Sequence, residues 1–193
     1  MYILFEGIDT CGKTTQIELL KQEFKQIIFT KEPGATEFGI KAREILLSGS
    51  IQSKKAELLL FLSDRAEHYE EVIKPNLNKT IISDRGFISG ISYALANEDF
   101  DFDTLLKLNR FSLEDTMPDK VILFQTNMQT LQQRMGEKTL DGIELRGLEY
   151  LLSVQDYMIS SVQKIRLNYI IIDASDSVEN IYDKIKEYIK DEQ

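Results

Sequence analysis

Cysteine and histidine each occur only once in this chain of 193 residues, as Cys11 and His68, and tryptophan does not occur at all. A single cysteine excludes an intramolecular disulfide. One cysteine and one histidine are also too few for the usual sets of zinc ligands. Because no histidine lies near Cys11 in the sequence, we interpret Cys11 as a small residue that fits its loop and not as a catalytic thiol.

Basic residues are fewer than acidic ones: the chain has 23 Lys and Arg residues and 32 Asp and Glu residues, which gives a net charge of -9. Surfaces that bind nucleic acid in general are usually basic, so we expect no nucleic-acid partner. No apolar run approaches the length of a membrane span, and no cationic leader precedes the first apolar run. We therefore expect a cytoplasmic protein without a membrane partner, in which local cationic groups hold any anionic ligand.

Short apolar runs rich in β-branched residues alternate with helical patterns along the whole chain. The runs are residues 2–5, 27–30, 80–83, 121–124 and 169–172. Alternation of this kind predicts a parallel sheet that is covered by helices on both faces. We predict an α/β fold with three layers, α/β/α, around a five-stranded parallel sheet, formed by residues 1–193 as a single domain without a linker.

A glycine-containing segment lies between the first predicted strand and a helical pattern. It fits the phosphate-loop pattern of Gly, four residues, then Gly-Lys-Ser/Thr. The backbone N–H groups of such a loop and the start of the next helix bind phosphate. Lys13 is expected to reach the β- and γ-phosphates, and the Thr14 hydroxyl to bind Mg²⁺. The predicted ATP-binding residues are Gly7, Ile8, Asp9, Thr10, Cys11, Gly12, Lys13 and Thr14.

Further candidates lie at a strand end and on a helix. Active sites of parallel sheets lie beyond the carboxyl ends of the strands. Asp84 and Arg85 end the third predicted strand, where a carboxylate can hold Mg²⁺ and an arginine can bind phosphate. Phe61 and Arg65 share a face of a predicted helix and could stack on a base and hydrogen-bond its edge. The alternatives are a salt-bridged strand end and a core phenylalanine beside a surface arginine.

Arg134 and Lys138 lie where the chain enters a polar stretch punctuated by glycine, residues 136–147, between two helical patterns. A stretch of this kind can close over a site as a lid, bring cations to a transferring phosphoryl group and exclude water. The alternative is that both residues are ordinary charges on a helix surface.

Together these segments resemble the thymidylate kinase family, whose members are P-loop nucleoside-monophosphate kinases. The matching stretches are FEGIDTCGKTTQ (5–16), KEPGATEFG (31–39), LLFLSDRAEHYEEVIKP (59–75), SDRGFISGISYA (83–94), PDKVILF (118–124) and the weaker LDGIELRGLEYL (140–151). The resemblance implies a P-loop NTPase fold with a short lid at about 135–147, and a homodimer. It also implies that ATP phosphorylates dTMP to dTDP with Mg²⁺ as cofactor.

The resemblance implies roles for individual residues as well. Asp9 is similar to the carboxylate that meets the 3′-hydroxyl of dTMP, and Tyr93 to the tyrosine below its sugar. Phe61 and Arg65 are similar to the residues that stack on thymine and hydrogen-bond its edge. The other implied roles are dTMP-phosphate binding and catalysis for Arg85, catalysis for Lys13 and Asp9, metal binding for Thr14 and Asp84, and catalytic lid cations for Arg134 and Lys138.

The chain departs from the family pattern at several positions, among them Gly90 and the lid motif. Gly90 stands where a polar residue beside the sugar is common. The usual Asp-Arg-x-Glu of the lid reads Asp141-Gly142-Ile143-Glu144, without the arginine.

The alternatives to dTMP kinase activity are a kinase for another deoxynucleoside monophosphate or a deoxynucleoside and, more remotely, a nucleotide-gated switch or binding module. The guanine-reading Asn-Lys-x-Asp motif of switch GTPases fails, because the segment reads Asn78-Lys79-Thr80-Ile81.

Overall fold

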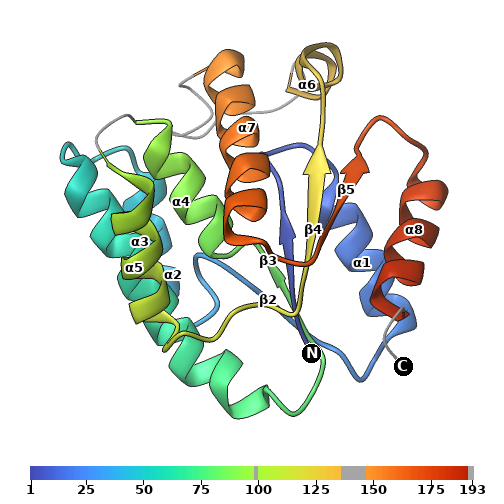
Figure 1. Ribbon diagram of the computed structural model, residues 1–193, viewed down its shortest axis with the longest axis horizontal. Helices are drawn as coiled ribbons and strands as arrows, with labels where there is room; N and C mark the ends of the chain where they lie inside the picture. Colours follow the sequence, from blue (N-terminus) through green and yellow to red (C-terminus); the bar gives the residue numbers. More distant parts are fainter. Residues whose placement is uncertain (98–99, 136–146, 191–193) are drawn as a thin grey trace.

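A computed structural model of the chain describes residues 1–97, 100–135 and 147–190. Its elements are β1 (Tyr2–Glu6), α1 (Lys13–Glu23), β2 (Ile28–Lys31), α2 (Glu37–Leu47), α3 (Lys54–His68), the π-helix η1 (Tyr69–Ile73), the 3₁₀-helix η2 (Lys74–Asn76), β3 (Ile81–Asp84), α4 (Phe87–Leu95), α5 (Phe102–Ser112), β4 (Lys120–Gln125), α6 (Met128–Met135), α7 (Leu148–Ile165), β5 (Tyr169–Asp173) and α8 (Val178–Lys190). All strands pair in parallel in the order β2-β3-β1-β4-β5, which confirms the predicted five-stranded sheet (Figure 1).

Alternate residues of a strand enter hydrophobic cores on opposite faces of the sheet. In β1, Leu4 belongs to the core formed with α4 and α7, whereas Phe5 belongs to the core formed with α1 and α8. Both side chains are completely buried. Figure 1 shows α1 and α8 together on one side of the sheet and α4 and α7 on the other. The three-layer α/β/α arrangement is therefore confirmed, and it explains why the strands are apolar throughout.

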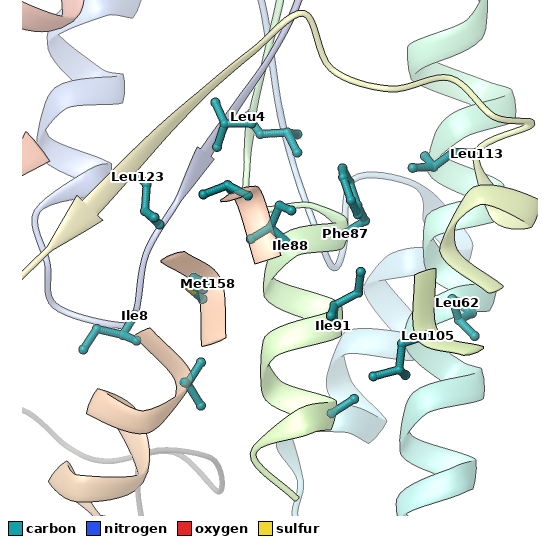
Figure 2. Packing of buried hydrophobic residues seen from close by; sticks show 14 of the residues in the cluster. Leu4, Ile8, Leu62, Phe87, Ile88, Ile91, Leu105, Leu113, Leu123 and Met158 are labelled. Carbon is teal, nitrogen blue, oxygen red and sulfur yellow. The ribbon is translucent and has the colours of Figure 1, made fainter. Parts of the chain in front are cut away.

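The core on the α4 face extends outward from the sheet to α3 and α5. Figure 2 shows Leu123 of β4 with Ile88 of α4 and Met158 of α7, and farther out Leu105 of α5 beside Leu62 of α3. All five side chains are buried. Packing in this outer region fixes α3 and α5 relative to α4, so polar side chains from the three helices can meet in a defined geometry.

Local capping sets the start of several helices. The side chains of Thr36, Ser53 and Asp101 each accept a hydrogen bond from a backbone N–H of the helix that follows, at the start of α2, α3 and α5. Helix α1 instead begins after Gly12, which has no side chain and has a φ of 94°. The first N–H groups of α1 therefore remain available for an anion.

Candidate active site

The phosphate loop lies between the carboxyl end of β1 and the start of α1, as predicted. Gly7 has a φ of 149°, which places it in the region that favours glycine. A Cβ on Gly7 would lie 2.8 Å from Cys11 Sγ and 3.0 Å from the Phe124 carbonyl oxygen, so this position does not accommodate a side chain. The close approach lets the loop turn sharply at the end of the strand.

Lys13 is buried inside the curve of this loop. Its Nζ donates hydrogen bonds to the carbonyl oxygens of Gly7 at 2.8 Å and Ile8 at 2.9 Å, and lies 3.5 Å from Cys11 Sγ. The surrounding phosphate-loop cavity is lined by residues 9–15 together with residues 31, 32, 43, 84 and 85. An ammonium group that is held by backbone carbonyls at a helix start is well placed to bind a phosphate.

Arg85 follows β3 directly and has a φ of 70°, an uncommon value for a residue with a side chain. Its guanidinium donates to the Gly7 carbonyl oxygen at 2.7 Å, to Asp9 Oδ1 at 2.7 Å and to Ser89 Oγ at 3.1 Å. Burial alone would lower the pKa of Arg85, but the charge of Asp9 raises it well above its ordinary value. The site therefore holds a permanent positive charge in a fixed orientation.

A second cavity, the Phe61 cavity, adjoins the first and contains the predicted acceptor site. Phe61, Arg65 and Tyr93 line it, together with Asp9 and Arg85. These residues come from the β1–α1 loop, α3, the β3–α4 junction and α4, so the fold brings all five together. Asp9 and Arg85 line both cavities, which places one continuous site along the carboxyl edge of the sheet.

Tyr93 lies at the wall between Asp9 and the Phe61 cavity. Its hydroxyl donates to Asp9 Oδ2 at 3.4 Å, and its ring centroid lies 5.7 Å from the guanidinium carbon of Arg85. Burial raises the pKa of Tyr93 far above its ordinary value, so the hydroxyl stays protonated and acts as a donor. The ring occupies space beside the carboxylate that is predicted to meet a sugar hydroxyl.

Arg65 is buried and held by an ionised carboxylate. Its Nε and Nη2 both lie 2.8 Å from Glu32 Oε2, and His68 Nδ1 lies 2.8 Å from Glu32 Oε1. Burial alone would raise the pKa of Glu32, but Arg65 and then His68 outweigh it and lower the pKa below the ordinary value. Glu32 therefore stays charged and fixes one edge of the Arg65 guanidinium, which lines the Phe61 cavity.

Arg43 lines both cavities, although no sequence motif indicates it. Its Nη1 donates to the Pro33 carbonyl oxygen at 3.1 Å, so the side chain returns from α2 toward the β2 end. In the sequence Arg43 is one charge on an amphipathic helix. The only signal in the sequence is that Arg43 follows Pro33 by ten residues, close enough for its side chain to reach back to the end of β2.

Of the two predicted lid cations, Arg134 lies within the described residues and Lys138 does not. Arg134 donates to the carbonyl oxygens of Thr10 at 3.1 Å and Ala174 at 2.7 Å. It thereby lines a third cavity, the Arg134 cavity, beside Gln16 and on the α8 side of the loop. Lys138 and residues 136–146 of the predicted lid lie outside the described residues. The catalytic role of both cations stays a prediction.

Glu6 is a buried carboxylate at the end of β1, and the sequence predicts no role for it. It accepts a hydrogen bond from Ser89 Oγ at 2.5 Å and from the Ser89 backbone N at 3.2 Å. Burial raises the pKa of Glu6. Because Ser89 Oγ accepts from Arg85, Glu6 fixes the hydroxyl that stands behind the Arg85 guanidinium. No pattern in the sequence distinguishes this residue from an ordinary strand end.

Comparison with known proteins agrees with this geometry. The family model described as thymidylate kinase matches residues 5–185. A thymidylate kinase of Sulfurovum sp. is 65% identical over 190 residues, covering 98% of this chain and 100% of the relative, and one of Campylobacter concisus is 53% identical and covers 98% of each chain. The crystal structure of thymidylate kinase from Ehrlichia chaffeensis matches with a TM-score of 0.79 and 26% identity over 98% of both chains. The chain therefore belongs to the thymidylate kinase family, as the sequence motifs indicate.

Proposed function

We propose that this chain transfers the γ-phosphoryl group of ATP to dTMP where the Phe61 cavity meets the phosphate-loop cavity. As a member of its family it is an ATP-dependent kinase that converts dTMP to dTDP for dTTP synthesis. The observation that carries the assignment of the site is that Asp9 and Arg85 line both cavities. A phosphate bound by Arg85 would face the phosphates held by the loop.

The reaction needs positioning and charge more than it needs a base. An oxygen of the dTMP phosphate attacks the γ-phosphorus, and the bond from that phosphorus to the β-bridging oxygen breaks, which releases ADP. A phosphate monoester has a second pKa of about 6, so the attacking oxygen is largely ionised near pH 7. Lys13, Arg85 and Arg43 supply positive charge around the transferring group, because all three face the phosphate-loop cavity.

We place the thymine of dTMP against Phe61, with Arg65 as the donor to its edge, because both line the Phe61 cavity and neither lines the phosphate-loop cavity. An aromatic ring and a planar guanidinium suit a base face and a base edge respectively. Asp9 and Tyr93 then lie beside the sugar, between the base and the phosphate. This order of groups matches a nucleoside monophosphate that lies with its phosphate toward Arg85.

Mg²⁺ fits one buried group of this site. Within the ranges that the structure describes, Asp84 Oδ1 is a buried acceptor without a hydrogen-bond partner. Asp84 and the hydroxyl of Thr14 both line the phosphate-loop cavity, and oxygen ligands of these types suit Mg²⁺. We assign both residues to the metal or its bound water. When bound there, the ion would neutralise charge on the β- and γ-phosphates.

A steady-state assay of ADP release tests the reaction and its metal. ATP is combined with each nucleoside monophosphate in turn, with Mg²⁺ and after its removal by a chelator. We expect the highest kcat/KM for dTMP, about 100-fold above dCMP, and almost no turnover without Mg²⁺. A preference for dAMP, dCMP or dGMP would reassign the acceptor. Absence of ADP release with every monophosphate would remove the kinase assignment.

We propose that Arg134 contacts the base of ATP. The Arg134 cavity adjoins the loop at Thr10 and Gly12 and is also lined by Ala174, but Lys13 does not line it, so it can continue the ATP path away from Lys13. The guanidinium is held flat by two carbonyl oxygens, and a planar cation of this kind stacks well on an aromatic base.

Arg134→Ala should raise the KM for ATP by about tenfold and change the KM for dTMP by less than twofold, because one stacked cation contributes about 1 kcal/mol or more to binding. Steady-state kinetics with each substrate varied in turn gives both values. If kcat falls by 100-fold or more while the KM for ATP is unchanged, the side chain acts on the transferring phosphate, as the sequence predicts.

We also propose a homodimer that packs through α2 and α3. On α3 the exposed residues Ala56, Leu59, Ser63 and Ala66 repeat at intervals of three or four and form one uncharged stripe. Leu59 is 57% exposed, and the neighbouring α2 exposes Ile45 at 48%. Small and apolar side chains on adjacent helices allow two copies to approach closely, and such a surface is unusual on a monomer.

Leu59→Lys should shift the protein from dimer toward monomer, because it places a charge in the centre of the proposed contact. Light scattering behind size-exclusion chromatography measures the change against the chain mass of 22.3 kDa. Leu77→Lys, at a 41% exposed apolar residue just after η2, is the matched control and should leave the mass unchanged. A wild-type protein that is monomeric at micromolar concentration would contradict the dimer.

We place the enzyme in the cytoplasm, where the ATP and deoxynucleotides for DNA synthesis are held. Among the described residues, no helix has the length and apolar character that crossing a bilayer requires. Fractionation of cells, followed by the dTMP-dependent ADP-release assay on each fraction, tests this location. Activity confined to another fraction would contradict it.

A further inference from the structure

Fixed protein acceptors engage almost every donor of the Arg65 guanidinium. An arginine carries five N–H donors, one on Nε and two on each terminal nitrogen. Nε and Nη2 share Glu32 Oε2, and Nη2 also donates to the Gly86 carbonyl oxygen at 3.1 Å. Nη1 donates to Asn109 Oδ1 at 2.5 Å. Among the described contacts, this leaves one N–H on Nη1 for a ligand in the Phe61 cavity.

Asn109 is a buried residue on α5 and lies 44 residues from Arg65 in the chain. Its Nδ2 donates to the Leu105 carbonyl oxygen at 2.7 Å, one helical turn earlier. A carbonyl oxygen requires a donor and a guanidinium requires an acceptor, so these two partners fix which end of the amide faces Arg65. Leu105 is itself locked in the core beside Leu62 of α3 (Figure 2).

The two terminal nitrogens of the Arg65 guanidinium, Nη1 and Nη2, also lie close to Gly90 of α4. A Cβ at this position would lie 2.9 Å from Nη1 and 3.1 Å from Nη2 of Arg65. A glycine is therefore needed for Arg65 to lie this close to the helix. The guanidinium is confined between Gly90 of α4 and Asn109 of α5, and Glu32 holds its third edge.

We infer that Asn109 is a positioning residue that sets how Arg65 reads the pyrimidine. By occupying one N–H of Nη1, it directs the other toward the Phe61 cavity as a donor. A donor at this place pairs with a carbonyl oxygen of thymine or uracil and is mismatched with the exocyclic amine of cytosine. Asn109 thus contributes to selection of a keto pyrimidine. This inference rests on the proposed function, since it assumes that the cavity binds the base of dTMP.

The test combines direct binding with kinetics in the full-length protein. Asn109→Leu removes the acceptor at similar volume. We expect the Kd for dTMP, measured by calorimetry without ATP, to rise by about 10-fold or more, because a hydrogen bond to a charged group is lost. The preference for dTMP over dCMP should fall by a similar factor, whereas the KM for ATP should change by less than twofold. Asn109→Asp keeps an acceptor for Arg65 but loses the donor to the Leu105 carbonyl oxygen, so it should weaken dTMP binding by less than Asn109→Leu does.

Two further variants separate positioning from a general effect on folding. Ser112→Ala lies one turn along α5, where its hydroxyl donates only to the Leu108 carbonyl oxygen among the described residues, and should leave both nucleotide affinities unchanged. Gly90→Ala places a methyl group against Nη1 but suits a helix better than glycine. Because the methyl group displaces the Arg65 guanidinium, this variant should weaken dTMP binding and reduce the preference for dTMP over dCMP, with the KM for ATP within twofold of the wild type.

The outcomes distinguish the inference from the function on which it rests. If the wild type binds and phosphorylates dTMP, but Asn109→Leu and Gly90→Ala keep its affinity and its preference over dCMP, the role of Asn109 is wrong and the function stands. Loss of dTMP and ATP affinity in parallel with a lower Tm would show a purely structural role. If the wild type does not bind dTMP at all, the proposed function fails first, and the inference fails with it.

Discussion

Lys13→Ala is expected to lower kcat for dTMP phosphorylation by about 10³-fold and to leave the fold intact. The ammonium group is the positive charge that the phosphate loop itself contributes, and it is held by the Gly7 and Ile8 carbonyl oxygens at 2.8 and 2.9 Å. Preorganised charge of this kind acts on the transition state without reorganisation, and removal of one such group typically costs 10²- to 10³-fold. A charge that also orients the γ-phosphate belongs at the upper end of that range.

The measurement is ADP release at saturating ATP and dTMP, with the Tm and the Kd for dTMP recorded on the same samples. The dTMP affinity should change by less than threefold, because the acceptor lies in the Phe61 cavity. Lys21→Ala is the matched control on α1: its Nζ pairs with Glu18 at 2.7 Å on the helix surface, and it should keep full activity. A Lys13→Ala enzyme within tenfold of the wild type would contradict the assignment of the loop.

The features that could be predicted from the sequence are those in which local pattern and function coincide. The phosphate loop is one, because Gly7 and Lys13 are contiguous with the strand and helix that position them. The order of the layers is another, because apolar strands need cover on both faces. Phe61 and Arg65 could be paired because they lie four positions apart on one helix. Each of these inferences needs only neighbours in sequence or the general geometry of parallel sheets.

The residues that the sequence did not reveal act through tertiary neighbours. Arg43 is a helix-surface charge until α2 folds back to the end of β2. Asn109 acquires a role only when α5 packs on α3 and meets Arg65. Glu6 matters through Ser89, which is 83 residues away in the chain. The role of Gly90 is also hidden in the sequence, where it stands only as the absence of a common polar residue. In the structure it makes room for the Arg65 guanidinium.

Arg85→Ala is expected to reduce kcat/KM for dTMP by about 10³-fold, and the loss should be larger than for any other residue of the Phe61 cavity. Arg85 is charged, buried and held by Gly7, Asp9 and Ser89, and it is placed to bind the acceptor phosphate in both the ground state and the transition state. An arginine that binds phosphate bidentately contributes geometry as well as charge. KM for dTMP should therefore rise and kcat should fall in the same variant.

Arg85→Lys separates charge from geometry. A lysine keeps the positive charge but cannot span three acceptors with one planar group, so we expect an intermediate loss of about 10²-fold. Arg110→Ala, at an exposed arginine paired with Asp115, is the control and should be silent. Asp9 is negatively charged and pairs with Arg85 at 2.7 Å, so part of its effect depends on Arg85, and Asp9→Asn combined with Arg85→Ala should cost less than the sum of the two single changes. If the two losses simply add, the two residues act independently. That outcome would contradict their proposed joint role where the two cavities meet.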